Sequence, residues 1–262
     1  MTQTETEFPA GQEGIDRAGI AQRLIGTLLW PVKTFESINR KPTWLAPLII
    51  ATVAMILGNM FFNWRVNPDW EQLTRNRIMQ RMWTLGEQVP QEQIEQQVAL
   101  AKTIAKFSTV VPVVLIPANC FILAGIFALG FKILLQAQAS FRKVLSVVAW
   151  SMAATRLAST VLLVAILIGR SKESLEGFDR TQSSLVLTNL AFILSKHASA
   201  AIKSFVSSLD VITIWLLILL IIGFVAIAGS RKIKVAKIDA LVFGLWAGWV
   251  FVKVVLSAAF GS

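Results

Sequence analysis

The chain has few of the residues that build catalytic or metal sites. Its 262 residues include one cysteine, Cys120, and one histidine, His197. A lone cysteine forms no disulfide framework, and a metal site needs several His, Cys, Asp or Glu side chains that converge. A Ser-His-Asp triad would have to use His197, and no Gly-x-Ser-x-Gly elbow surrounds any serine. Phosphate-binding and dinucleotide-binding glycine motifs are missing as well. The sequence therefore predicts no enzyme and no cofactor.

Charge is also scarce, at 15% of residues against roughly 25% in ordinary globular domains, while 55% are hydrophobic. The apolar residues come in long runs, and a helix needs about 20 of them to cross the hydrocarbon core. Five stretches fit this length: residues 45–62, 110–131, 147–168, 211–229 and 240–260. Because a helix satisfies its own backbone hydrogen bonds in lipid, the sequence predicts an all-α membrane protein with about five transmembrane helices.

The net charge of +10 comes from basic residues beside the apolar runs. No basic stripe with interleaved aromatics suggests nucleic acid, whereas anionic lipid headgroups attract Lys and Arg at this position. The candidate headgroup contacts lie in the two short connections: Arg142 and Lys143, and Arg231, Lys232, Lys234 and Lys237. The positive-inside rule then places the N-terminus in the cytoplasm and the C-terminus outside. We expect a multi-pass protein of a cell membrane, of the bacterial cytoplasmic type.

The segments outside the spans have their own patterns. Residues 1–16 are polar and predicted to be disordered, and residues 42–262 form the transmembrane domain. In residues 17–41, apolar side chains recur every three or four positions among Arg17, Arg23, Lys33, Arg40 and Lys41. This pattern predicts an interfacial amphipathic helix. A helix packed on the membrane domain is the alternative.

Two longer connections predict extramembrane amphipathic helices on the outer face. Residues 63–109 indicate two helices broken at Val89-Pro90. A second apolar stripe indicates one helix with His197 on its solvated side. Its members are Leu187, Leu190, Leu194, Ala198, Ala201, Phe205 and Leu209. We expect both segments to cap the membrane domain.

Few polar side chains interrupt the spans. Arg156 is near mid-depth of the third span, where an arginine costs roughly 2.5–3.5 kcal/mol on insertion scales, so it should face protein or water. Asn119 lies at a similar depth in the second span, and the two could line an anion-binding or headgroup-binding cavity. The alternative is an arginine that snorkels to the interface or bonds to helix carbonyls. Asp210, just before the fourth span, is predicted to cap that helix.

Glycines in the spans are candidates for close contacts between helices. They are Gly125, Gly130, Gly223, Gly244 and Gly248. The last two have the small-x-x-x-small spacing found where membrane helices associate. This spacing is common, so it is a weak indication of self-association.

A set of motifs follows in order along the chain: Trp30-Pro31 with Phe35 and Ile38, residues 41–49 (KPTWLAPLI), residues 141–150 (FRKVLSVVAW), Ser208-Leu209-Asp210 before Ile214-Trp215, and Gly223-Phe224. This ordered set resembles the Yip-domain (Ypt/Rab-interacting protein) membrane family, in particular its bacterial branch. The resemblance covers roughly residues 17–260. It implies a five-helix membrane domain with a cytoplasmic N-terminus. Eukaryotic members are membrane scaffolds of vesicle traffic that interact with Rab-type GTPases.

Three functions are compatible with these observations. The first is a non-enzymatic membrane scaffold or membrane-organising protein that acts through lipids, other membrane proteins or self-association. The second is a transporter or channel for a small solute, ion or lipid, with a polar path near Arg156. The third is an accessory subunit of a larger membrane complex.

Overall fold

The computed structural model describes residues 19–86, 89–107, 110–136, 139–170, 199–228 and 235–260. The predicted disordered segment, residues 1–16, lies outside them. Within these ranges the chain forms the helices α2 (Ile20–Leu29), α3 (Pro31–Arg40), α4 (Leu45–Val66), α5 (Trp70–Leu85), α6 (Gln91–Phe107), α7 (Val111–Ile133), α8 (Phe141–Gly169), α11 (Ala200–Val206), α12 (Val211–Ile227) and α13 (Val235–Phe260).

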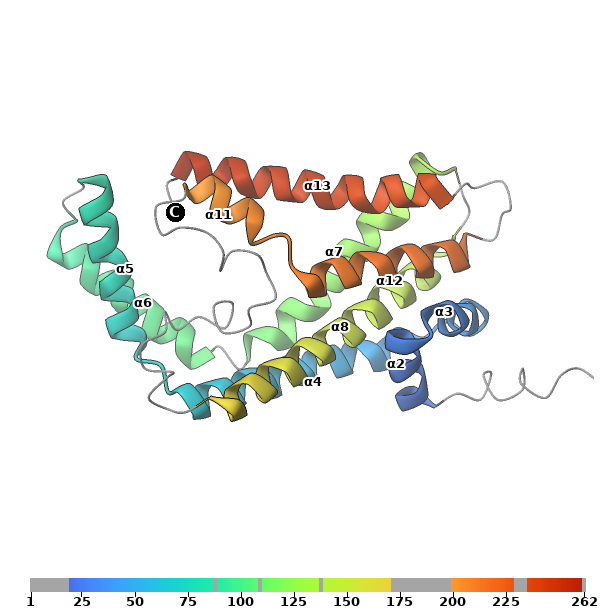
Figure 1. The fold of residues 1–262 in the computed structure, drawn as a ribbon, viewed down its shortest axis with the longest axis horizontal. Coiled ribbons are helices and arrows are strands. Elements are labelled where there is room, and N and C mark those ends of the chain that lie inside the picture. Colours follow the sequence, from blue (N-terminus) through green and yellow to red (C-terminus); the bar gives the residue numbers. More distant parts are fainter. Residues whose placement is uncertain are drawn as a thin grey trace, which may run out of the picture.

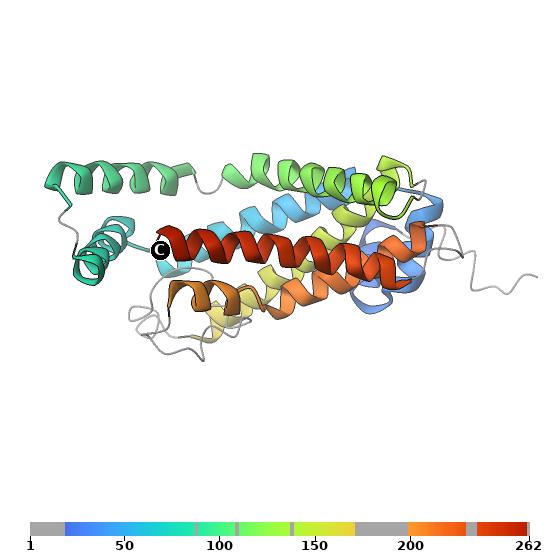
Figure 2. The same ribbon diagram turned by 90° about the horizontal axis from the view of Figure 1, so that it is seen from above.

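Helices α4, α7, α8, α12 and α13 lie along one long axis, and each runs opposite to the one before it (Figures 1 and 2). They coincide with the five predicted spans, and the prediction of an all-α membrane fold is confirmed. Among the described residues, α4, α7, α8 and α13 are long and apolar enough to cross a membrane. Helix α12 has 17 residues, the lower end of the usual range of about 17–25.

The first half of α8 forms the centre of the bundle. Every residue from Val144 to Thr155 is buried, and α8 packs against α2, α3, α4, α7 and α12. A helix that is buried on all sides lies in the core rather than at its edge. Around it, the ring of Phe224 from α12 packs against Phe127 and Phe131 of α7, with ring centroids 4.6 and 5.2 Å apart.

Two of the five candidate glycines allow close helix contacts. A Cβ atom on Gly223 of α12 would overlap Val147 of α8 and lie 3.1 Å from the ring of Phe35 in α3. On Gly130 of α7 it would lie 2.7 Å from Leu241 of α13. No described atom beyond the local helix lies within 4 Å of such a Cβ at the other three, Gly125, Gly244 and Gly248. The small-x-x-x-small pair therefore makes no close helix contact in the described structure.

Residues 17–41 were predicted to form one helix, and the structure corrects this. Residues 20–40 form two helices, α2 and α3, with a turn at Trp30-Pro31. Proline has no amide hydrogen and disfavours a helical conformation in the residue before it, and Trp30 has φ −133° and ψ 59°. Phe35 and Ile38 of α3 are fully buried, and α3 packs against α12 and α8. These helices are therefore part of the bundle, and their depth in a membrane stays a prediction.

Helices α5 and α6 form a hairpin, and the predicted break between them is confirmed. Gly86 ends α5 with φ 65°. Glu71 of α5 pairs with Lys102 of α6 and with Arg75, and Arg75 pairs with Glu95 of α6 at 2.9 Å. Hydrogen bonds from Lys102 and then Arg75 lower the pKa of Glu71. The hairpin projects beyond the bundle instead of capping it (Figure 1), because Asn67, with φ 44°, ends α4 and redirects the chain.

The other predicted cap is described only in part. Its C-terminal portion is α11, a helix of 7 residues that packs against α13. Leu187, Leu190, Leu194 and Ala198 of the predicted stripe, and His197, lie outside the described residues.

Candidate functional site

The two polar residues predicted at mid-depth lie on α8 (Arg156) and α7 (Asn119). Arg156 follows directly on the buried stretch of α8, yet its own side chain is exposed, and Asn119 of α7 is exposed as well. Within the described part of the chain, no hydrogen bond joins the two residues. A polar site formed by Arg156 and Asn119 therefore stays a prediction.

Polar residues do meet at the short break between α11 and α12. Asp210 is the N-cap of α12, and its Oδ2 accepts hydrogen bonds from the Thr213 amide (3.1 Å) and hydroxyl (3.2 Å). From α13, the ammonium of Lys253 donates to Ser208 Oγ at 3.0 Å and to Ser207 Oγ at 3.4 Å. Lys253 therefore links the segment between α11 and α12 to α13.

Replacement of Lys253 with methionine is expected to loosen α11. A helix of 7 residues is not stable alone, and the substitution removes the Lys253 hydrogen bonds to Ser207 and Ser208. If the free energy of opening α11 falls by about 1 kcal/mol, the amide groups of α11 exchange about fivefold faster. Hydrogen exchange with mass spectrometry measures this rate. The control, Lys237→Met at the other end of α13, should leave α11 unchanged, and an equal acceleration in both variants would contradict the assignment.

Helices α2 and α3 lie at the opposite end of the bundle (Figure 1), and the elements at this end carry many basic residues. This end also holds the first turns of α4, α8 and α13 and the last turns of α7 and α12. Its described basic residues are Arg23, Lys33, Arg40, Lys41, Lys132, Arg142, Lys143 and Lys237, and its described acids are Glu36 and Asp239. Of the candidate headgroup contacts, Arg142 and Lys237 are exposed and Lys143 is half-buried. Arg231, Lys232 and Lys234 lie outside the described residues.

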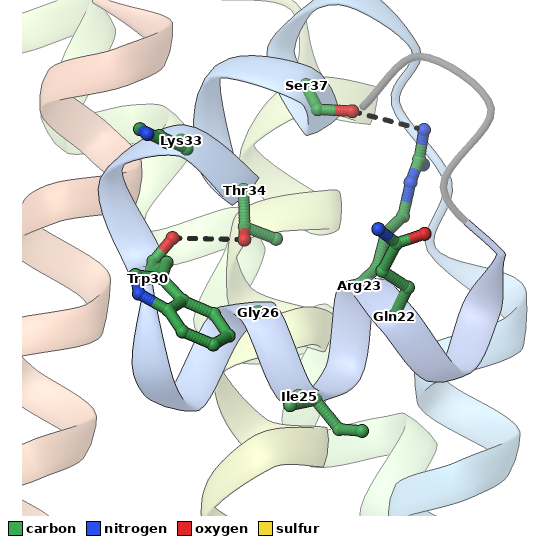
Figure 3. Close-up of a pocket in the computed structure, with 8 residues that line it drawn as sticks. All are labelled: Gln22, Arg23, Ile25, Gly26, Trp30, Lys33, Thr34 and Ser37. Carbon is green, nitrogen blue, oxygen red and sulfur yellow. Dashed lines mark hydrogen bonds between the residues drawn. The ribbon is translucent and has the colours of Figure 1, made fainter. Parts of the chain in front are cut away.

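A pocket of about 500 Å³ opens between α2 and α3 at this basic end (Figure 3). Its lining residues are Gln22, Arg23, Ile25, Gly26, Trp30, Lys33, Thr34 and Ser37. Basic, amide and hydroxyl side chains line the pocket together with Ile25 and Trp30. The pocket therefore offers both polar and apolar groups to a ligand.

The turn at Trp30-Pro31 and the small Gly26 bring the two walls of the pocket together. A Cβ atom on Gly26 would lie 2.5 Å from Thr34 Oγ1, so only glycine allows α3 to approach α2 this closely. The Thr34 hydroxyl donates to the Trp30 carbonyl oxygen at 3.0 Å (Figure 3), which closes the turn.

Arg23 is the buried cation of the pocket, with 6% of its surface exposed. Its Nη1 donates to the Lys41 carbonyl oxygen (3.3 Å) and to Thr43 Oγ1 (3.2 Å), and its Nη2 donates to Ser37 Oγ (3.4 Å). These contacts orient the guanidinium. Thr43 in turn accepts a hydrogen bond from the indole of Trp150, with its carbonyl oxygen 2.9 Å from Nε1. The arginine is therefore anchored to the central helix.

The sequence family agrees with this architecture. The Yip1 domain matches residues 25–261, nearly the whole chain. The chain belongs to the Yip1 domain family. No curated protein and no solved structure matches it. As a Yip1-domain protein with several apolar helices, it is a multi-pass membrane protein.

The pocket lies at the start of the Yip1 domain. The family match begins at Ile25, so it includes most of the lining residues and leaves out Gln22 and Arg23. The periodicity of residues 17–41 placed Arg23 with the other basic residues of an amphipathic helix and did not indicate its burial. Pro31, five positions after Gly26, was the available signal, because a proline-induced turn would fold α2 onto α3.

Proposed function

We propose that this Yip1-domain protein is a non-enzymatic membrane-organising protein that acts through lipid and protein contacts at the cytoplasmic face of a bacterial cell membrane. The observation that carries the proposal is the gathering of basic side chains at one end of an apolar bundle. Anionic lipids attract such a cluster, with about 1 kcal/mol for each Lys or Arg near the surface. The Yip1 family is not known as enzymatic, which supports a role in organising membranes. Partners would be anionic lipids, other membrane proteins or a second copy of the chain.

The orientation can be tested with single cysteines in a Cys120→Ser background. We expect Lys237→Cys, in the first turn of α13, to react with a membrane-impermeant reagent only from the cytoplasm. Ala259→Cys, at the other end of the same helix, should react only from outside, because five passes place the two ends of the chain on opposite sides. Both positions are exposed in the structure. Labelling of both cysteines from one side would exclude the five-pass topology.

The function itself is tested by extraction of the protein in its native lipid, crosslinking, and identification of the proteins and lipids recovered. Enrichment of anionic lipid together with a reproducible protein partner supports a membrane-organising role. A bare monomer without lipid preference contradicts it. A solute flux measured in liposomes would instead favour a transporter if the Arg156→Ala substitution abolishes that flux.

A further inference from the structure

We propose that α7 packs against α7 of a second copy of this chain, so that the protein forms a symmetric dimer in the membrane through a stripe of side chains around Asn119. The proposal deepens the function above and rests on it in one respect, because it names the second copy as a protein partner. Its failure would leave the lipid contacts and the other protein contacts of that function untouched.

One face of α7 carries a regular stripe of exposed side chains. Its members are separated alternately by four and three residues: Leu115, Asn119, Ile122, Ile126, Leu129 and Ile133. The five apolar members are between 41% and 66% exposed, and Asn119 is exposed as well. The buried side chains of α7, among them Cys120, Ala124 and Phe127, lie on another face, and α7 packs against α4 and α8. Figure 2 shows α7 along one edge of the bundle, where a second molecule can approach it.

The spacing of the stripe is the seven-residue repeat of helices that pack side by side. Apolar residues at positions a and d of such a repeat keep one seam of the helix turned toward a partner helix. Here the two positions are occupied by Asn119, Ile126 and Ile133 (a) and by Leu115, Ile122 and Leu129 (d). In parallel pairs, isoleucine at a with leucine at d favours two strands, and a single asparagine at an a position fixes the register. Most membrane helices pack with this left-handed geometry.

Asn119 favours a protein partner over lipid. It lies three residues from Ile122, the middle residue of α7, which is roughly 4.5 Å along the helix axis. Within the described residues its side chain makes no hydrogen bond. Lipid tails have neither donors nor acceptors, so an unpaired amide at this depth is costly. Asparagine side chains in membranes form hydrogen bonds across helices, and a partner helix would supply what lipid lacks.

A second copy fits this requirement because copies of one membrane protein insert in the same orientation. Two α7 helices related by a twofold axis along the membrane normal are therefore parallel and at equal depth. A residue beside such an axis meets its own counterpart. Asn119 then lies opposite Asn119 of the second copy, and since each amide has donors and an acceptor, the two can bond to each other. The same symmetry places each apolar member of the stripe against an apolar member.

Cysteine crosslinking in native membranes tests the interface. In the Cys120→Ser background, Ile122→Cys is expected to give a disulfide-linked dimer on mild oxidation, because a side chain beside the twofold axis is within reach of its counterpart. The matched control, Phe121→Cys, lies at nearly the same depth and is 39% exposed, but it points about 100° away around the helix. It should remain monomeric. Equal crosslinking of the two variants would indicate random collision and overturn the interface.

The role of Asn119 is tested by the monomer–dimer equilibrium of the full-length protein in liposomes. Energy transfer between copies labelled at the N-terminus reports association as the ratio of protein to lipid is varied. We expect Asn119→Leu to weaken association about tenfold, as for the loss of a hydrogen bond between helices. Leucine gives no compensating gain, because lipid tails are as apolar as leucine. Asn119→Gln keeps the amide and should retain most of the association.

Three results would overturn the proposal while the proposed function stands. The first is a wild-type protein that stays monomeric at every ratio of protein to lipid. The second is an Asn119→Leu variant that associates as well as the wild type. The third is crosslinking of Ile122→Cys to a different membrane protein instead of to itself, which would assign the stripe to that partner. The lipid enrichment that tests the proposed function depends on none of these results, so the two can fail separately.

Discussion

Replacement of Gly223 with alanine is expected to destabilise the bundle by about 1–3 kcal/mol, the usual cost of overpacking. The new Cβ would overlap Val147 and lie 3.1 Å from two ring carbons of Phe35. Neither neighbour moves easily, because both side chains are fully buried and valine is stiff at χ1. Helix α12 would have to move away from both α8 and α3. A lower midpoint of thermal unfolding in detergent measures the effect.

The substitution Gly125→Ala is a matched control for this prediction. Gly125 of α7 has no described atom beyond its own helix within 4 Å of a Cβ, so Gly125→Ala adds a methyl group in open space. Alanine is favoured over glycine in a helix interior by up to about 1 kcal/mol. The two substitutions should therefore shift the midpoint in opposite directions. Equal midpoints for Gly223→Ala and Gly125→Ala would show that α12 does not pack against α8 through this glycine.

The glycines also show why some features of the fold could be predicted and others could not. A membrane span of about 20 apolar residues can be recognised from composition alone, because the thickness of the hydrocarbon core sets its length. The five predicted spans are accordingly helices in the structure. Which face of each helix meets a neighbour depends on packing between distant segments. Sequence spacing therefore favoured Gly244 and Gly248, whereas the close approaches are at Gly130 and Gly223.

For the polar residues too, position in a span can be predicted from sequence, whereas burial depends on packing between distant segments. The depth of Arg156 in its span follows from counting residues, but its exposure in the described structure depends on how α8 is rotated against its neighbours. Arg23 was harder to place, because its burial requires the turn at Trp30-Pro31 together with the Ser37 and Thr43 hydroxyls. These contacts join residues 14 and 20 positions apart. Local periodicity cannot show contacts between separate elements.

The buried tryptophan that anchors this network gives the largest expected effect of a single substitution. Trp150 is the largest fully buried side chain of the described structure. Its replacement with alanine leaves a cavity in the middle of α8 and should destabilise the protein by about 3–5 kcal/mol. The packing part of this cost persists in a membrane, because van der Waals contacts drive the association of membrane helices. Unfolding in detergent, followed by circular dichroism, measures the loss.

A second variant separates the packing of Trp150 from its hydrogen bond. Trp150→Phe keeps an aromatic ring but loses the donor to the Thr43 carbonyl oxygen, so its cost should include about 0.5–1.5 kcal/mol for that bond and stay well below the cost of alanine. Trp249→Ala serves as the control and should be close to neutral, because Trp249 of α13 is 67% exposed. Equal destabilisation by Trp150→Phe and Trp150→Ala would show that the hydrogen bond to Thr43, and not packing, accounts for the effect.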